Sequence, residues 1–174
     1  MIDQLHAIAN RMVAPGKGIL AADESTGSIA KRLESINTPS TGESRRDYRE
    51  MLFTATEAMR AYVSGVILYD ETIRQNARNG TALVEVIKAT GAIPGIKLDT
   101  GAKPLALSSG ETITEGLDGL AARVAEYAKI GAQFAKWRAV IDIGKGIPSH
   151  NAIHANAHAL ARYAAICQAG GIVP

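Results

Sequence analysis

A strand-like apolar run followed by a helical segment occurs four times along the chain, and this alternation is the feature that most limits the possible folds. The runs are rich in aliphatic side chains and cover residues 18–23, 63–69, 96–99 and 132–140. Strands that alternate with helices are expected to lie parallel and to be joined by right-handed crossovers. Because the runs are almost continuously apolar, we expect a sheet that is covered on both faces.

The segments between these runs carry apolar side chains at helical spacing. Helices are predicted near residues 5–12, 29–36, 82–90, 117–128 and 153–164. A longer helix is predicted behind a capping box, with Ser40 as the N-cap and Glu43 three residues later, and its apolar face continues to Met59. Residues 100–116 form a predicted loop that is long for a compact domain, and we expect it to be functional. Residues 172–174 begin another apolar run.

Two architectures fit this alternation, an open doubly wound sheet and a (β/α) barrel. Several charged residues lie late in their predicted strands, namely Asp23, Lys97, Asp99, Lys136 and Arg138. This placement favours the barrel, in which the active site lies at the C-terminal ends of the strands. No Gly-x-Gly-x-x-Gly sequence follows the first strand, which weakens the dinucleotide-binding alternative. A complete barrel needs about 250 residues. We therefore expect a single domain, residues 1–174, that supplies the first four β/α units of a parallel (β/α)8 TIM barrel and the start of strand five.

The composition argues against several classes of function. With 174 residues and a net charge of +2, the chain can form a sizeable core and is too weakly basic to predict binding to nucleic acid or to an anionic membrane. Its single cysteine, Cys167, cannot form an internal disulfide and is typical of a reducing compartment. No apolar run approaches the length of a membrane span, and residues 1–6 do not resemble a signal peptide. We expect a cytoplasmic protein.

Lys136 and Arg138 stand two residues apart in an apolar strand, so their side chains point to the same side. Two such cations need an anionic group opposite them, unless the strand lies at an edge with its charges in water. Together with Asp23 and Lys97, they suit a small, strongly anionic substrate, since arginine offers a rigid fork for phosphate and lysine a movable charge. The spacing alone indicates phosphosugar chemistry through a Schiff base, with Lys136 as the nucleophile.

Ser25 and Ser28 lie in a loop that opens a predicted helix, and they add hydroxyl and N–H groups of the kind that hold phosphate. Each of these polar residues, taken singly, is equally compatible with a salt-bridged or capping position at the end of a strand.

His150, His154 and His158 are four residues apart and share one helix face, a spacing that can bind zinc. No carboxylate general base accompanies them as in His-Glu-x-x-His. The apolar positions Ile153 and Leu160 also place this row beside the predicted buried face of the helix. We therefore predict no metal site and no cofactor.

Five stretches together resemble class I fructose-1,6-bisphosphate aldolase, and they occur in the order in which that family has them. They are residues 16–33, Gly-Ile-Lys-Leu-Asp at 95–99, Glu-Gly-Leu-Asp-Gly-Leu at 115–120, Phe-Ala-Lys-Trp-Arg at 134–138 and Leu-Ala-Arg-Tyr-Ala at 160–164. The resemblance implies a (β/α)8 barrel that cleaves fructose 1,6-bisphosphate reversibly into dihydroxyacetone phosphate and glyceraldehyde 3-phosphate in glycolysis and gluconeogenesis. It also implies a cytoplasmic homotetramer that needs neither metal nor cofactor.

The resemblance implies roles for individual residues as well. Asp23 resembles the carboxylate that assists proton transfer and cleavage of the carbon–carbon bond. Lys136 resembles the lysine beside the Schiff base. In the family that lysine tunes charge and helps to form and dehydrate the carbinolamine. The resemblance therefore differs from the spacing, which indicates Lys136 as the nucleophile. The groups that the resemblance places around the substrate phosphates and sugar hydroxyls are Ser25, Ser28, Arg32, Arg45, Lys97 and Arg138.

In the family, the lysine that forms the Schiff base, a proton-transferring glutamate and the second phosphate site follow the part that matches this chain. We therefore expect the 174-residue chain to be one half of the enzyme and to be inactive alone. Two alternatives stay open. One is a different Schiff-base barrel enzyme that uses Lys136, and the other is a non-catalytic fragment that acts by binding.

Overall fold

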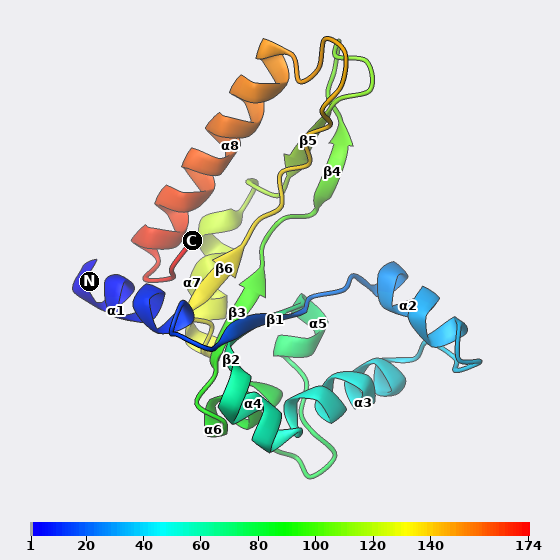
Figure 1. The fold of residues 1–174 in the computed structure, drawn as a ribbon, viewed down its shortest axis with the longest axis vertical. Helices are drawn as coiled ribbons and strands as arrows, with labels where there is room; N and C mark the ends of the chain where they lie inside the picture. Colours follow the sequence, from blue (N-terminus) through cyan, green and yellow to red (C-terminus); the bar gives the residue numbers. More distant parts are fainter. Residues whose placement is uncertain (1) are drawn as a thin grey trace.

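The computed structural model describes residues 2–174 and is built around a four-stranded parallel sheet with the strand order β1-β2-β3-β6 (Figure 1). The strands span Gly18–Ala22 (β1), Val63–Leu68 (β2), Ile93–Lys97 (β3) and Phe134–Lys136 (β6). At the free edge of β6, Val173 pairs with Phe134 in parallel, and the Ala135 amide donates to the Val173 carbonyl at 2.7 Å. The prediction that a fifth strand begins near residue 172 is therefore confirmed.

The strands lie in the sheet in the same order as in the chain, so each crossover adds a strand at the same edge. Right-handed crossovers of this kind place the connecting helices on one face. A doubly wound sheet instead reverses its strand order and carries helices on both faces. The observed order therefore agrees with part of a (β/α) barrel and contradicts the doubly wound alternative.

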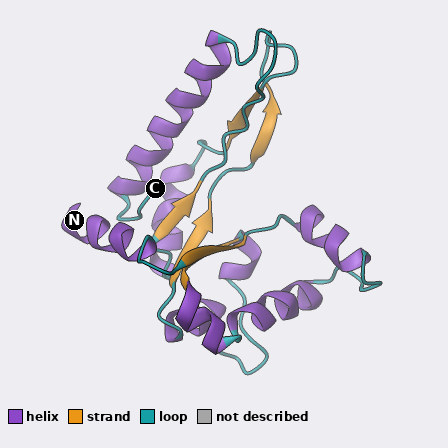
Figure 2. Ribbon diagram, in the orientation of Figure 1, coloured by secondary structure: helices purple, strands orange, loops and turns teal. Residues whose placement is uncertain are grey.

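Helices precede, connect and follow the strands (Figure 2). They span Ile2–Met12 (α1), Thr26–Glu34 (α2), Gly42–Phe53 (α3), Thr56–Tyr62 (α4), Asp70–Ile73 (α5), Leu83–Ala89 (α6), Leu120–Ile130 (α7) and His150–Ala169 (α8). None of the helices within residues 2–174 combines the length and the apolar character that crossing a bilayer requires.

The predicted helix behind Ser40 is wrong in two respects. Thr41 is the N-cap, because its hydroxyl accepts from the Ser44 amide at 3.1 Å while its own amide donates to Ser44 Oγ at 2.9 Å. Ser44 therefore completes the capping box in place of Glu43. The helix is also divided into α3 and α4 by a break after Phe53. A hydroxyl at either neighbouring position can cap a helix, so the local sequence did not decide between them.

The main hydrophobic core includes residues of β2, α6, α7 and α8. A smaller cluster formed by Ile8, Ile93 and Phe134 attaches α1 to the sheet. The Phe134 ring lies across two glycines, Gly95 of the adjacent strand β3 and Gly65 of β2. A Cβ atom at Gly65 would lie 3.0 Å from its Cε1 atom, and one at Gly95 would lie within 2.5 Å of its Cε2 atom. The absence of side chains at these two positions therefore makes room for the ring.

Residues 100–116 are not a loop as predicted. They contain an antiparallel hairpin of β4 (Gly101–Pro104) and β5 (Thr112–Glu115), which extends along α8 (Figure 1). The predicted strand 132–140 is a regular strand only over Phe134–Lys136. Beyond it the chain runs beside β5, where Thr114 Oγ1 donates to the Arg138 carbonyl at 2.7 Å and Thr112 Oγ1 donates to the Val140 carbonyl at 2.8 Å. These contacts with the hairpin replace the expected sheet pairing.

The buried face of α8 also differs from the predicted one. Ile153 and Leu160, expected inside, are 48% and 37% exposed. The buried residues are Ala152, Asn156, Ala159, Tyr163 and Cys167. Asn156 Nδ2 donates to the Thr112 carbonyl at 3.0 Å, so this face is held against the hairpin. The choice of face is a tertiary effect, since small and polar residues let the helix approach β5 closely.

Candidate active site

A cleft of about 540 Å³ opens at the C-terminal ends of the parallel strands. Its lining includes seven of the residues that were predicted from the sequence as site residues: Asp23, Ser25, Ser28, Arg32, Lys97, Lys136 and Arg138. Parallel strands bring their carboxyl ends to the same edge, which is why residues more than 100 positions apart in sequence meet here. The cleft is the candidate active site.

Asp23 and Lys136 form an ion pair at the centre of this cleft. Asp23 directly follows β1 and Lys136 ends β6, and Lys136 Nζ lies 2.7 Å from Asp23 Oδ2. The two side chains are 12% and 30% exposed, so both remain accessible to a small ligand. Lys97 is the register partner of Lys136 in the adjacent strand. Strand pairing thus places the two lysines side by side, while Asp23 reaches Lys136 from β1, at the other edge of the four-stranded sheet.

Asp99 contacts Lys97 and the backbone of Gly101 and Arg138 in the cleft, and it was not among the predicted site residues. Its side chain is only 3% exposed. One carboxylate oxygen forms an ion pair with Lys97 Nζ and accepts from the Gly101 amide at 3.2 Å, while the other accepts from the Arg138 amide at 3.3 Å. A buried carboxylate with several donors holds each of them in place. The Lys-x-Asp spacing at 97–99 was the sequence signal for this role.

The start of α2 brings two hydroxyl groups to the cleft. Ser25 is the N-cap of α2, its Oγ accepts from the Ser28 amide at 3.4 Å, and the two Oγ atoms lie 3.0 Å apart. The first turn of a helix presents N–H groups and a positive dipole end, which favour a bound anion. This part of the cleft can therefore hold a phosphate oxygen.

Arg32 lies at the rim of the cleft and is paired with Glu24, a second residue that the sequence reasoning did not list. Arg32 donates to Glu24 Oε1 at 2.7 Å and to the Tyr48 hydroxyl at 3.1 Å. These contacts, first the hydrogen bond to Tyr48 and then the charge of Glu24, raise the pKa of Arg32 above its usual value. Because the Arg32 side chain is 60% exposed, its guanidinium can also reach an anionic ligand.

Arg45 does not line the cleft, and its place beside the substrate stays a prediction. Its guanidinium donates two hydrogen bonds to Glu71, at 2.6 and 2.8 Å, and a third to the Ser40 carbonyl at 3.2 Å. The hydrogen bond from Arg45 also lowers the pKa of Glu71. The side chain therefore ties the start of α3 to α5, and its fork is occupied by a carboxylate.

The histidine row of α8 is not part of the cleft. The rings of His150 and His154 have their centroids 4.6 Å apart, and both side chains are exposed. Within residues 2–174, no group of three or more His, Cys, Asp or Glu side chains is arranged to hold a metal ion.

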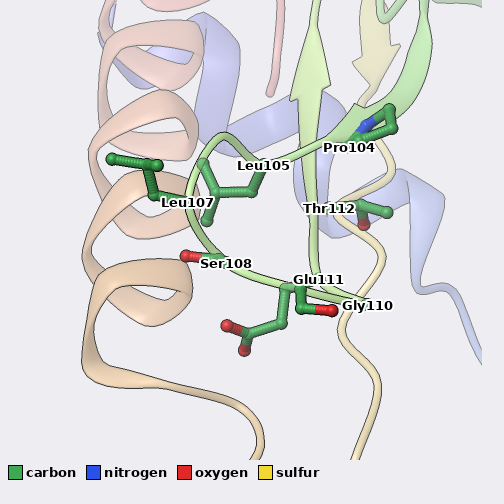
Figure 3. Close-up of a pocket in the computed structure, with 8 residues that line it drawn as sticks. Pro104, Leu105, Leu107, Ser108, Gly110, Glu111 and Thr112 are labelled. Carbon is green, nitrogen blue, oxygen red and sulfur yellow. The ribbon is translucent and has the colours of Figure 1, made fainter.

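A second hollow, of about 600 Å³, lies at the turn of the β4–β5 hairpin (Figure 3). It is lined by residues between Pro104 and Thr112, and Glu111 is its only charged side chain. Both Glu111 oxygens are already used, because they accept from the Ser149 amide at 2.6 Å and the Ser149 hydroxyl at 2.5 Å. The lining of this hollow has no cation for an anionic ligand, and Glu111 attaches the hairpin to the start of α8.

The cleft at the strand ends, in contrast, combines four cations, helix-capping hydroxyls and a carboxylate in contact with a lysine. The cations and hydroxyls can bind phosphate, and the Asp23–Lys136 pair can exchange a proton with a bound molecule.

Comparisons with known proteins agree with this arrangement. The family model of fructose-bisphosphate aldolase class-I matches residues 4–174. The chain is 58% identical over 173 residues to the probable fructose-bisphosphate aldolase class 1 of Xanthomonas axonopodis pv. citri, covering 99% of this chain and 52% of the relative. It is 57% identical over 171 residues to fructose-bisphosphate aldolase C of Carassius auratus, covering 98% and 47%.

A solved structure is similar as well. It is a ternary co-crystal structure of fructose-bisphosphate aldolase from Plasmodium falciparum in complex with TRAP and a small-molecule inhibitor. The TM-score is 0.95 at 45% sequence identity, over 99% of this chain and 50% of that chain. This likeness confirms the predicted partial (β/α)8 barrel. The chain spans about half the length of the curated relatives that it matches, and it belongs to the class I fructose-bisphosphate aldolase family.

Proposed function

We propose that residues 1–174 supply one half of an active site that cleaves fructose 1,6-bisphosphate reversibly into dihydroxyacetone phosphate and glyceraldehyde 3-phosphate. The reaction runs through a Schiff base on a lysine that the family carries after the part matched here, so the 174-residue chain alone is inactive. We further propose that the protein acts in glycolysis and gluconeogenesis, in the cytoplasm, as a homotetramer and without metal or cofactor. Membership of the family supports these proposals.

The contact between Lys136 Nζ and Asp23 Oδ2 at 2.7 Å is the observation that carries the proposal. A carboxylate that is hydrogen-bonded to an ammonium can pass a proton to or from a substrate oxygen held beside it. Asp23 is thus placed to assist proton transfer during bond cleavage. Lys136 donates to Asp23, which supports a role in tuning charge and dehydrating the carbinolamine and does not support a role as the attacking nucleophile.

The remaining groups bind the substrate in this proposal. Lys97, Arg138 and Arg32 supply positive charge around the cleft, and Ser25 and Ser28 supply hydroxyls at the start of α2. Charge-assisted hydrogen bonds of this kind are roughly twice as strong as neutral ones, which suits them to phosphate. Placing the phosphate fixes the sugar carbons relative to Asp23 and Lys136.

The test is cleavage of fructose 1,6-bisphosphate followed in a coupled assay. The purified 174-residue chain is expected to be inactive, and activity is expected when it is co-folded with the C-terminal half of the Xanthomonas axonopodis relative. In that complex Lys136→Met should lower kcat by about 100-fold or more, since it removes a proton-transfer partner. The matched control is Arg46→Lys, which changes a cation of α3 that does not line the cleft.

Two results would contradict the proposal. Cleavage by the 174-residue chain alone would show that the missing lysine is not needed, and an inactive complex would remove the support for the reaction itself. Borohydride trapping with dihydroxyacetone phosphate, followed by peptide mapping, separates the alternative enzyme. A label on Lys136 would identify that residue as the nucleophile.

A further inference from the structure

Arg49 is an arginine with no exposed surface, and neither the sequence motifs nor the description of the cleft gives it a task. It lies on α3, and together with Phe53 it forms the buried face of that helix. An unpaired buried charge costs several kcal/mol, and even a paired one is often no better for stability than an apolar side chain of the same volume. Stability alone is therefore a weak reason for an arginine at this position.

The Arg49 guanidinium joins two segments that follow parallel strands. One terminal nitrogen donates to Thr72 Oγ1 at 2.6 Å, on α5 after β2. The other donates to the Glu24 carbonyl at 2.6 Å, after β1, and lies 3.6 Å from Glu24 Oε2. Thr72 is itself fully buried. The planar fork of arginine allows both contacts at once, which a lysine cannot reproduce with the same geometry.

Glu24 stands between two residues of the cleft. Asp23 precedes it and pairs with Lys136, while Ser25 follows it and caps α2. The Glu24 side chain is 9% exposed, and its Oε1 holds Arg32 at 2.7 Å. Its Oε2 has no hydrogen-bond partner among the described residues, and the Arg49 guanidinium lies 3.6 Å from it as a counter-charge.

We propose that Arg49 is a positioning residue of the candidate active site, which fixes the Glu24 peptide and carboxylate and so orients Asp23, Ser25 and Arg32. This inference rests on the proposed function, since it assigns Arg49 to the same cleft. Arg49 touches no substrate in this scheme and acts through Glu24. A displacement of about 1 Å in a positioned group can cost a factor of about 100 in rate, which is why an anchor buried beneath the cleft is useful.

The first test measures amide hydrogen exchange in the 174-residue chain. The reporter is the Ile29 amide, which donates to the Ser25 carbonyl at 2.9 Å. The reference is the Gln133 amide, which donates to the Pro94 carbonyl at 2.8 Å in the sheet. Arg49→Lys is expected to raise the exchange rate of Ile29 about tenfold relative to Gln133, because it leaves buried acceptors unpaired.

A second pair of variants keeps the inference testable if Arg49→Lys does not fold. Thr72→Val removes the hydroxyl acceptor and keeps the shape, and it should also raise the relative exchange of Ile29. Thr72→Ser keeps the acceptor and should preserve the wild-type ratio. A purely structural role of Arg49 would change Ile29 and Gln133 in parallel, and that result would overturn the inference.

The second test is calorimetric binding of fructose 1,6-bisphosphate at a temperature where every variant is folded. Arg49→Lys and Thr72→Val should weaken binding about tenfold, whereas Arg46→Lys and Thr72→Ser should not. Unchanged affinity in the first two variants would overturn the inference even if exchange of Ile29 had risen. If the wild-type chain does not bind the sugar bisphosphate, its half of the site does not hold the substrate unaided, and the exchange ratio alone decides the role of Arg49. The proposed function is decided separately, by the activity of the co-folded complex.

Discussion

Replacing Gly95 with alanine is expected to destabilise the chain and to displace the strand that carries Lys136. Gly95 and Phe134 are register partners in β3 and β6, and the ring of Phe134 lies over the Gly95 Cα. The new methyl group would lie within 2.5 Å of ring atom Cε2 and closer still to Cζ and Cε1. Gly65 of β2 has no Cβ atom, but an added one would lie 3.0 Å from Cε1, so the ring already occupies the space beside β2.

The magnitude follows from two opposing effects. Overpacking of a filled core costs about 1–3 kcal/mol, and the lower entropy of an unfolded alanine returns about 0.4–1 kcal/mol. The net loss in the free energy of unfolding should be about 1–2 kcal/mol. With a urea dependence of about 2 kcal/mol per molar, the unfolding midpoint should fall by roughly 0.5–1 M. Because Phe134 and Lys136 share one face of β6, the displacement should also weaken the pairing of Lys136 with Asp23.

Urea unfolding followed by tryptophan fluorescence measures this effect directly. Trp137 is the only tryptophan, it follows Lys136, and its ring lies 5.3 Å from that of Tyr163. Gly18→Ala is the control, since a Cβ atom there has no neighbour within 4 Å. Equal midpoints for Gly95→Ala and Gly18→Ala would refute the reasoning. The reasoning would also be refuted if Gly95→Ala lowered the unfolding midpoint as much in a Phe134→Leu background as it does beside the intact ring.

Three further predictions concern stability and reactivity. The hydrogen bond from Arg45 is the main reason why the pKa of Glu71 in the folded chain lies below its usual 4.5. The ionised Glu71 therefore contributes its full stabilisation to the folded chain above pH 4.5, and this stabilisation is lost as the pH falls through the lowered pKa. Glu71→Gln should therefore flatten the acid branch of a melting-temperature profile, and an unchanged profile would contradict the assignment. Burial raises the pKa of Cys167 to about 12, so iodoacetamide at pH 8 should label it only in denaturant, as intact mass would reveal. Thr41→Ala removes the cap completed by Ser44 and should cost about 1 kcal/mol in urea unfolding, unlike Thr41→Ser.

Much of the fold could be predicted because it depends on local patterns. Aliphatic runs that alternate with helical spacing indicated parallel strands, and four of them pair in the order of the chain. The polar residues at the strand ends indicated a common site, since parallel strands share one carboxyl edge. Asp23, Lys97, Lys136 and Arg138 do line one cleft.

The errors fall where a distant segment decided the outcome. Residues 100–116 pair as a hairpin, and the helix predicted at 153–164 turns a different face inward because that hairpin lies against it. A distant segment also sets the partner of Arg45, because Glu71 of a separate helix holds its guanidinium. Charge and helical spacing are local properties, whereas the partner of a side chain depends on how the segments pack.

The sequence by itself therefore determined the order of strands and helices and the kinds of side chain at the strand ends, because backbone periodicity and residue type are local. Only the tertiary structure decided which of these side chains meet. It brought Lys136 to Asp23 across 113 positions and placed the buried Arg49 beneath Glu24, since both contacts join segments that follow or cover different strands. No local pattern encodes such distances, which arise from the packing of the whole sheet and its helices.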